Sequence, residues 1–267
     1  MKLITSSIEN PFRPFLLLAP PRAHIPGAFH KVQVDREYHA DLLAEMQRLR
    51  GQVYLEDGAI DKSQLTPCGR HDLDIDHESW HLITLNRQGM VSGCVRFLQH
   101  SASATWNELR VRTAALARTR LWARKLRNAV ETELDDARNR GMAYIEFGGW
   151  ALTKELRGTT EALRIALATC GWAQAVGGCL GISTVTARNG SSSILRRIGG
   201  RSLEIDGEEL PPYYDPFYKC EMEILRFDSG CPDARYAPWV EQIRSHLFHV
   251  QVISNAAEMF QVATIAV

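Results

Sequence analysis

The stretch IEFGGWAL, residues 145–152, constrains the fold more than any other segment of the chain. It is apolar and partly aromatic, as a buried strand is, yet it contains the carboxylate of Glu146 and the consecutive glycines Gly148 and Gly149. A double glycine inside a strand marks a β-bulge or a close approach of another group to the backbone. A bulge turns backbone N–H groups away from the ladder. The sequence therefore predicts a core strand with donors available to a ligand.

A helix is expected to follow this strand at once. In the segment LTKELRGTTEALRIAL, Arg157 and Gly158 form a turn, and Thr159 and Thr160 are capping candidates before an apolar helical run. A helix N-terminus offers free N–H groups and the positive end of the helix dipole, which suits a pyrophosphate-bearing ligand. The alternative is a tight bend followed by an ordinary capped loop, and a short glycine motif taken alone favours that alternative.

The order of the remaining elements predicts one mixed α/β domain. We expect a hairpin over 80–98, long helical signals over 106–140, and strands over 142–152, 179–187 and 217–225. Helices are expected over 36–54, 161–178, 189–200 and 237–253. The expected organisation is an N-terminal arm over 1–30, a main domain over 31–230 and a C-terminal helical extension over 231–267.

Composition limits the possible partners. Lys and Arg number 31 and Asp and Glu also number 31, so no net charge draws the chain to nucleic acid or to a membrane surface. The first 27 residues lack the continuous apolar run of a signal peptide or a membrane span. The six cysteines are scattered without a CxxC pair, which indicates free thiols in a reducing cytoplasm. We expect a cytoplasmic protein without nucleic-acid binding or stable membrane insertion.

The strand, the Arg-Gly turn, the following helix and strand, Asn189 and LRRIGG together resemble the core of the GNAT acyltransferase superfamily. The resemblance implies a GNAT-like mixed central sheet flanked by helices, with a bulged central strand. It also implies that the bulge contacts the pantetheine arm of an acyl donor. Arg157, Gly158, Thr159, Thr160 and Asn189 would then hold the donor's phosphates. The family pattern has a further glycine where Thr160 stands in this chain.

A narrower resemblance extends over about residues 37–210. The segments RGQVY, HDLDID, GCVRFL, IEFGGWAL and STVTARNGSSSILRRIGG occur in the order seen in N-acyl homoserine lactone synthases and the related N-acyl amino acid synthases. Those enzymes take an acyl group from acyl carrier protein or acyl-CoA and place it on an amine. The lactone synthases have a Ser-Arg pair where this chain has Gly148 and Gly149, and their aspartates are spaced differently from Asp72, Asp74 and Asp76. We therefore expect an N-acyl amino acid or another N-acyl amine as the product.

Amide formation from a thioester needs a base for the amine and donors for the oxyanion. Glu146 is the candidate base, and the backbone N–H groups near Gly149, Trp150 and Ala151 are the candidate donors. A core carboxylate paired with Arg96 is the alternative for Glu146, and both descriptions can hold together. The candidate contacts for the acceptor and the acyl chain come from three segments: Arg50, Tyr54, Asp74, Asp76, Trp80 and Arg96. The alternatives are an exposed helix charge at Arg50, a solvated acidic loop, and a core position at Trp80.

The segment LRVRTAALARTRLWARKLRN is basic and contains no acidic residue. A concentrated basic helix suits docking of an acidic partner, and acyl carrier protein is strongly acidic. The candidate docking residues are Arg118, Arg120, Arg124 and Lys125. The alternative is a solvated helix balanced by the acidic residues between 131 and 136, and nucleic acid is a weaker third option. Cys68, His71, His77 and His81 match no common metal site, so no metal is expected.

The sequence thus predicts an N-acyltransferase that moves a medium or long acyl chain from acyl carrier protein or acyl-CoA to the amine of an amino acid or a similar small amine. The acyl-phosphopantetheine donor would be a co-substrate, with no permanently bound cofactor. Two alternatives stay open: an acetyl-CoA-dependent acetyltransferase of small amines, and a catalytically silent acyl-binding or regulatory domain.

Overall fold

The computed structural model describes residues 14–256, and residues 1–13 and 257–267 lie outside this description. A ten-stranded sheet forms its centre, in the order β10-β11-β6-β5-β4-β3-β1-β12-β2, with β7 paired to β11. The pairs β5–β6, β1–β12 and β12–β2 are parallel, and the other pairs in the sheet are antiparallel. The strands of the sheet are β1 (Phe15–Ala19), β2 (Lys31–Val34), β3 (Trp80–Leu85), β4 (Val91–His100), β5 (Ala143–Leu152), β6 (Cys179–Thr186), β7 (Arg201–Ser202), β10 (Tyr213–Asp215), β11 (Cys220–Asp228) and β12 (Gln251–Ser254).

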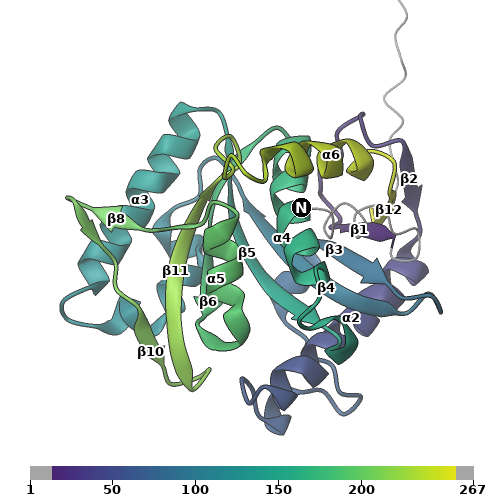
Figure 1. Ribbon diagram of the computed structural model, residues 1–267, viewed down its shortest axis with the longest axis horizontal. Coiled ribbons are helices and arrows are strands. Elements are labelled where there is room, and N and C mark those ends of the chain that lie inside the picture. The colour runs from purple at the N-terminus through teal and green to yellow at the C-terminus, as the bar shows by residue number, and fades with distance from the viewer. Residues whose placement is uncertain (1–13, 257–267) are drawn as a thin grey trace, which may run out of the picture.

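Helices cover both faces of this sheet (Figure 1). The helices α2 (Arg36–Glu56) and α3 (Ala123–Asn139) lie on one face, and α4 (Glu161–Ala175), α5 (Ser191–Arg197) and α6 (Ala237–Leu247) lie on the other. The strands β8 (Glu204–Ile205) and β9 (Glu208–Glu209) form a separate hairpin. Single turns of 3-10 helix complete the structure: η1 (Lys62–Gln64), η2 (Asp74–Glu78), η3 (Trp106–Glu108), η4 (Arg110–Thr113), η5 (Ala115–Arg118), η6 (Lys154–Leu156) and η7 (Arg188–Gly190).

The apolar stripe of α2 explains both its helical form and its position. Its apolar residues Leu42, Leu43, Met46, Leu49 and Val53 are all buried against β1, β3, β4 and β12. The residue before the helix, Asp35, accepts a hydrogen bond from the backbone N–H of Tyr38 at 2.9 Å, which caps the first turn. The helix is therefore fixed over one face of the sheet, where its C-terminal half borders the site described below.

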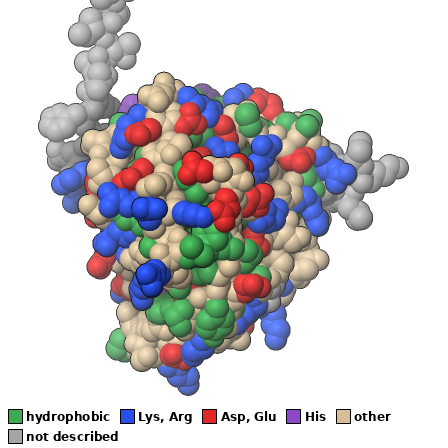
Figure 2. All heavy atoms as spheres, turned by 90° about the vertical axis from the view of Figure 1, so that its left-hand side faces the viewer, with side chains coloured by type: hydrophobic (Ala, Val, Ile, Leu, Met, Phe, Trp, Pro, Cys, Tyr) green, Lys and Arg blue, Asp and Glu red, His purple; other side chains and the backbone are tan. Residues whose placement is uncertain are grey.

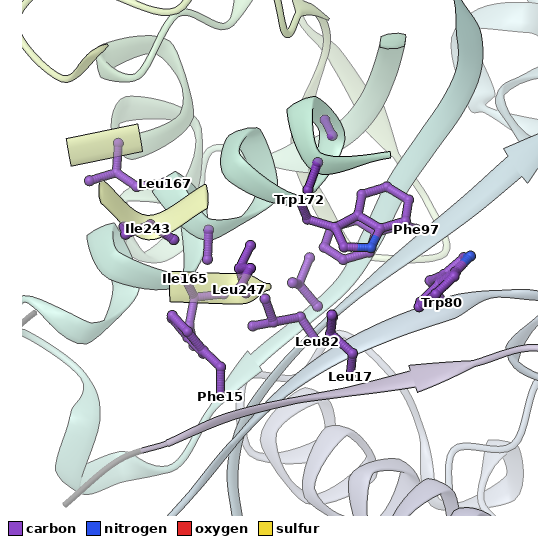
Figure 3. Close-up of a cluster of buried hydrophobic side chains, with 14 of the residues drawn as sticks. Phe15, Leu17, Trp80, Leu82, Phe97, Ile165, Leu167, Trp172, Ile243 and Leu247 are labelled. Atoms are coloured by element: carbon purple, nitrogen blue, oxygen red, sulfur yellow. The ribbon is translucent and has the colours of Figure 1, made fainter. Parts of the chain in front are cut away.

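The opposite face holds an aromatic core (Figure 3). The Trp172 side chain of α4 stacks on Phe97 of β4, with ring centroids 4.2 Å apart and planes inclined by 10°. The Trp80 ring of β3 lies 5.8 Å from Trp172, and all three residues are almost completely buried. Close contact between α4 and α6 depends on Gly171, where a Cβ would stand 3.1 Å from the backbone nitrogen of Arg244. This packing anchors α4 and the turn that precedes it.

Three segments differ from the expectation. Residues 15–19, which we expected within an extended arm, form the fully buried strand β1. Residues 251–254, which we expected at the end of a helix, form strand β12 beside β1, because α6 ends at Leu247. Residues 106–118 form three turns of 3-10 helix where long helical signals predicted regular helix, and α3 begins only at Ala123. The hairpin, α2, α4, α5 and the strands β5, β6 and β11 occur where the sequence predicts them.

Candidate active site

Strand β5 is bulged at the double glycine, as the sequence predicts. Arg96 of β4 stands opposite Gly148 and Cys94 stands opposite Ala151, so two residues of β5 face the single residue between them on β4. Gly149 has a φ of +65°, a conformation that costs a side-chain-bearing residue free energy. Its carbonyl oxygen accepts a hydrogen bond from Cys94 Sγ at 3.3 Å.

The other edge of β5 parts from β6 at the same level. The parallel register between these strands ends at Phe147 and Ser183, whose hydroxyl donates to the Phe147 carbonyl oxygen at 3.0 Å. Beyond that point residues 184–186 of β6 pair only with β11 within the described part of the chain. Strands β5 and β6 therefore splay apart, and Gly148, Gly149 and Trp150 line a cavity between them.

The cavity has a volume of about 460 Å³ and reaches both sides of the sheet through this splay. One limb is largely apolar and lies under α4 and α5. The other limb lies between α2, the turns η4 and η5, and the β10–β11 connection, and it is more polar. The lining on the side of α4 and α5 includes the apolar residues Phe147, Ile165, Ala166, Cys170, Ala173, Leu195 and Phe227, together with Thr169 and Ser191. On the side of α2 it includes the polar residues Tyr54, Asp57, Arg96, Arg110, Arg118, Glu146 and Tyr218, together with apolar residues such as Val53, Leu73, Ile75 and Leu98.

A buried charge cluster forms the floor of the polar limb. Arg50 is completely buried and donates from Nη1 to Asp76 Oδ1 at 2.9 Å, and its Nη2 also pairs with this carboxylate. Arg96 Nη1 lies 3.2 Å from the same oxygen, and Gln47 Nε2 donates to Asp76 Oδ2 at 3.1 Å. Burial alone would raise the pKa of the Asp76 carboxyl, but the hydrogen bonds and charge of Arg50 hold it well below its usual value.

The cluster contains two cations and one anion. Burial lowers the pKa of Arg96, and the nearby charge of Arg50 adds to this effect. Arg96 Nε is buried and has no hydrogen-bond partner among the described residues. The cluster of Arg50, Asp76 and Arg96 therefore carries one uncompensated positive charge beside the cavity, which favours an anionic ligand there.

The same arginines explain the double glycine. A Cβ at Gly149 would lie 3.2 Å from Arg50 Nη1 and 3.3 Å from the Cβ of Arg96. A Cβ at Gly148 would lie 3.2 Å from Arg96 Nη2. The absence of side chains at Gly148 and Gly149 thus lets the backbone of β5 contact the side chains of Arg50 and Arg96. A Cβ at either position would displace these arginines.

Glu146 does not pair with Arg96, so that alternative is wrong. Its Oε1 accepts from the backbone N–H of Val111 at 2.7 Å, and its Oε2 accepts from the backbone N–H of Arg110 at 2.8 Å. His100 Nε2 lies 2.9 Å from Oε2. The carboxylate therefore attaches the start of η4 to the sheet. Since two carboxylate oxygens offer about four acceptor positions, these three partners leave capacity for one more donor.

The other candidate contacts are not all brought together. Tyr54 lines the cavity, and its ring lies 5.6 Å from that of His71. Trp80 lies in the aromatic core and Asp74 is exposed on η2; neither lines the cavity. Trp150 does line it, and its indole Nε1 has no hydrogen-bond partner within the described residues.

The Arg-Gly turn precedes α4 as expected. Arg157 forms two hydrogen bonds with the Asp57 carboxylate, at 2.8 and 3.2 Å, and Gly158 has a φ of +72°. Thr159 Oγ1 accepts from the backbone N–H of Glu161 at 3.2 Å, and Thr160 occupies the N-cap position. Asn189, expected at the same phosphate site, falls in η7 at the end of β6.

The basic segment is spread over η4, η5 and the start of α3. Arg118, Arg120 and Arg124 are exposed, whereas Lys125 pairs with Glu208 and lies 4.7 Å from the Trp122 ring centroid. Of the acidic residues downstream, Glu131 pairs with Arg127 of the basic segment, whereas Glu133, Asp135 and Asp136 pair with Arg226, Arg138 and Arg140. The face bearing α3 and β10 shows Lys and Arg interspersed with Asp and Glu around an apolar area (Figure 2).

The cavity residues that the sequence does not predict include Arg110, Asp57 and Tyr218. Arg110 belongs to the basic segment, whereas Asp57 and Tyr218 belong to no recognised motif. Burial raises the pKa of Tyr218, so its hydroxyl is a donor at neutral pH. The signal for Tyr218 was the aromatic pair Phe217–Tyr218 just before β11, but no periodicity of the sequence places that pair over β5.

The described part of the chain contains neither a metal-binding cluster nor a membrane-spanning helix. Among residues 14–256, no group of three or more His, Cys, Asp or Glu side chains is arranged to hold a metal ion. Of the helices described, none is long and apolar enough to cross a membrane. All six cysteines, which fall between residues 68 and 231, are free thiols.

Comparison with known proteins gives the fold class. No protein-family model matches the sequence, and no curated protein matches it either. Solved structures do match, and their shared architecture confirms the predicted GNAT-like mixed sheet flanked by helices with a bulged strand. The chain therefore has the fold of the acyl-homoserine lactone synthases.

The particular structures show how far the likeness extends. BjaI, a CoA-dependent acyl-homoserine lactone synthase solved with SAM and isopentyl-CoA, is 11% identical, with a TM-score of 0.54 over 92% of this chain and 95% of that one. TofI, solved with an inhibitor and MTA, is 13% identical, with a TM-score of 0.50 over 88% and 99%. FeeM, an N-acyl amino acid synthase from uncultured soil microbes, is 12% identical, with a TM-score of 0.46 over 74% and 88%.

Proposed function

We propose that the chain is an enzyme, an N-acyltransferase that moves a medium or long acyl group to the amine of an amino acid or a similar small amine. The donor is a pantetheine thioester carried by acyl carrier protein or coenzyme A. The cavity through the splay of β5 and β6 carries this proposal, because it joins an apolar limb to a cationic one at an interrupted strand edge. Each limb suits one part of the product.

The donor's pantetheine arm lies along the free edge of β5 in this proposal. Its amides complete the hydrogen bonds that β6 does not make beyond Ser183. The thioester carbonyl then meets backbone N–H groups near Gly149, Trp150 and Ala151. Losing one such donor typically costs an enzyme about 3 kcal/mol of transition-state stabilisation.

The acyl chain occupies the apolar limb. The apolar lining of this limb favours a longer chain over an acetyl group. The limb is walled by Ile165 and Ala166 of α4 and by Phe227 of β11. Its apolar lining gains free energy from every methylene that it removes from water, about 0.8 kcal/mol each.

The acceptor occupies the polar limb. Its carboxylate would neutralise the extra positive charge of the Arg50–Asp76–Arg96 cluster, with Arg96 as the direct contact because it lines the cavity. Tyr54 contributes a hydroxyl whose pKa burial raises, so it serves as a neutral donor. An amino acid is thus favoured over a simple amine. Asp74 stands outside this arrangement.

Glu146 is the proposed base, directly or through a water molecule. The amine nitrogen loses its proton and attacks the carbonyl carbon, the C–S bond breaks, and the departing thiolate takes up a proton. Glu146 lines the cavity and keeps one acceptor position after binding its three partners. The Tyr218 hydroxyl lines the same limb and is a candidate proton donor to the sulfur.

The direct test is product analysis with purified protein. The protein is incubated with acyl carrier protein and coenzyme A thioesters of graded chain length and with a mixture of amino acids, and the products are identified by mass spectrometry. We expect N-acyl amino acids with medium or long chains. Transfer of acetyl groups alone would replace the proposal by a small-amine acetyltransferase, and no transfer with any donor would replace it by a silent acyl-binding domain.

We place the reaction in the cytoplasm, in keeping with six free thiols. Acyl carrier protein is the proposed partner, and exposed Arg118, Arg120 and Arg124 are its docking residues. Arg118 also lines the cavity, so a carrier bound at these residues would stand beside the polar limb.

A further inference from the structure

The phosphate-binding candidate Arg157 already has an anionic partner. Its Nη1 and Nη2 donate to the two oxygens of Asp57 at 2.8 and 3.2 Å, a paired arrangement in which the guanidinium presents one planar edge. Phosphate oxygens would use the same edge in the same geometry. Asp57 lines the cavity and Arg157 belongs to the turn before α4, so the pair stands beside the cavity at the start of that helix.

Other contacts hold Asp57 in this position. Arg188, from the turn after β6, donates through Nη1 to the backbone carbonyl of Asp57 and through Nη2 to that of Lys219 at 3.1 Å. Lys219 Nζ in turn lies 3.3 Å from the carboxylate of Asp61. The segment 57–61 is thereby tied to the turns that follow β5 and β6 and to the β10–β11 connection. These contacts fix the backbone at Asp57, so the pairing of its side chain with Arg157 is part of a connected network of hydrogen bonds and ion pairs.

We propose that Asp57 selects the donor, by disfavouring coenzyme A relative to a carrier-bound acyl-pantetheine. This inference rests on the proposed function and decides between its two donor types. The diphosphate of coenzyme A would have to displace the Asp57 carboxylate from Arg157, which leaves that carboxylate uncompensated, or bind beside an arginine whose charge Asp57 already neutralises. A carrier-bound arm has a single phosphodiester and no nucleotide, and its carrier gains binding free energy elsewhere, at exposed arginines such as Arg120 and Arg124.

The test substitutes Asp57→Asn, which keeps the shape of the side chain and removes its charge. We expect free coenzyme A, measured by calorimetry, to bind up to about fivefold more tightly to the variant, the change expected for loss of one partly exposed ionic competitor. The ratio of KM for acyl-CoA to KM for the matching carrier thioester should fall by a similar factor. Asp57→Ser serves as a second variant in case the asparagine amide retains the contact.

Two controls isolate the competition. Glu56→Gln removes the same charge at the adjacent exposed residue, which bonds to Gln52 and not to Arg157, so we expect coenzyme A affinity to stay unchanged. Adding Arg157→Met to Asp57→Asn should abolish the gain. Equal coenzyme A affinity in the wild type and both Asp57 variants would overturn the inference. Absence of acyl transfer from every donor would instead overturn the proposed function. The calorimetric comparison would still test the effect of Asp57 on coenzyme A binding, because that measurement does not require turnover.

Discussion

Gly149 is required both for the backbone conformation of the site and for the position of its two arginines. The bulge needs a positive φ at this residue, and the arginines that supply the site's positive charge pack against its Cα. A side chain here would alter both features at once, whereas one at Gly148 would meet only the end of the flexible Arg96 side chain. The two neighbouring glycines thus have different requirements, and each can be tested separately.

We predict that Gly149→Ala lowers both stability and activity. The strained φ and the displaced Arg50 and Arg96 should reduce the free energy of unfolding by about 1–3 kcal/mol. Gly148→Ala is the matched control, and we expect it to lose less stability. Urea denaturation and acyl-transfer rates measure the two effects. A Gly149→Ala variant as stable as Gly148→Ala would show that the bulge relaxes without strain.

We predict that Asp76→Asn destabilises the fold severely, because it leaves Arg50 and Arg96 buried without a counter-charge. Removing one partner of a buried ion pair typically costs about 3–5 kcal/mol. Asp74→Asn, two residues away on the exposed side of η2, should change the free energy of unfolding by less than about 0.5 kcal/mol. Thermal and urea unfolding of the pair compares them directly. Equal stabilities would mean that the cluster is not coupled to folding.

At the level of elements, the strand–turn–helix unit around β5 was predictable from the sequence because its signals are local. Glycines mark the bulge and the turn, and apolar periodicity marks α4. The backbone partners of Glu146 were not predictable in this way, because they lie far from it in the sequence. Arg110 and Val111, at the start of η4, precede Glu146 by 36 and 35 residues. Residues 106–118 have helical composition, but the buried side chains of Leu109, Val111 and Leu116 fold the segment into separate turns over the sheet.

We predict that the double variant Arg120→Glu and Arg124→Glu weakens use of the carrier-bound donor. Reversing two exposed charges should raise KM for acyl carrier protein thioesters most at low ionic strength, with kcat little changed, because docking and not chemistry is affected. The control is Arg22→Glu with Arg235→Glu, which makes the same change in net charge at exposed positions elsewhere. Steady-state kinetics over a range of salt concentrations provide the measurement. An equal KM for both double variants at low salt would remove this docking surface.

Across the whole molecule, the two ends of the described chain complete one edge of the sheet. Leu16 of β1 pairs with Gln251 of β12, and Lys31 of β2 pairs with Gln251 from the other side. The residues of β1 read as a short apolar patch among prolines, and β12 continues the apolar pattern of α6. No local sequence signal distinguishes β1 from an extended arm, or β12 from the end of a helix. Their strand form depends on pairing between residues more than 200 positions apart, which periodicity within one segment does not encode.

Three buried histidines couple the stability of the entire fold to pH. Burial lowers the pKa of His39 and of His71 from 6.5 to about 4, and that of His81 to about 3. The folded protein therefore keeps these imidazoles neutral at a pH where the unfolded chain protonates them. Their contribution to stability is complete above about pH 6.5 and is lost as the pH falls toward the folded-state values.

We predict that the free energy of unfolding decreases as the pH is lowered below about 6.5, by roughly 1.4 kcal/mol per pH unit for each histidine. Urea denaturation at about pH 7.5 and about pH 5.5 measures the difference. His39→Gln should reduce the slope by about one proton, because glutamine does not titrate in this range. His39 lies on α2 against the strand β1, so a slope that His39→Gln leaves unchanged would mean that this helix opens enough to hydrate the imidazole before the chain unfolds.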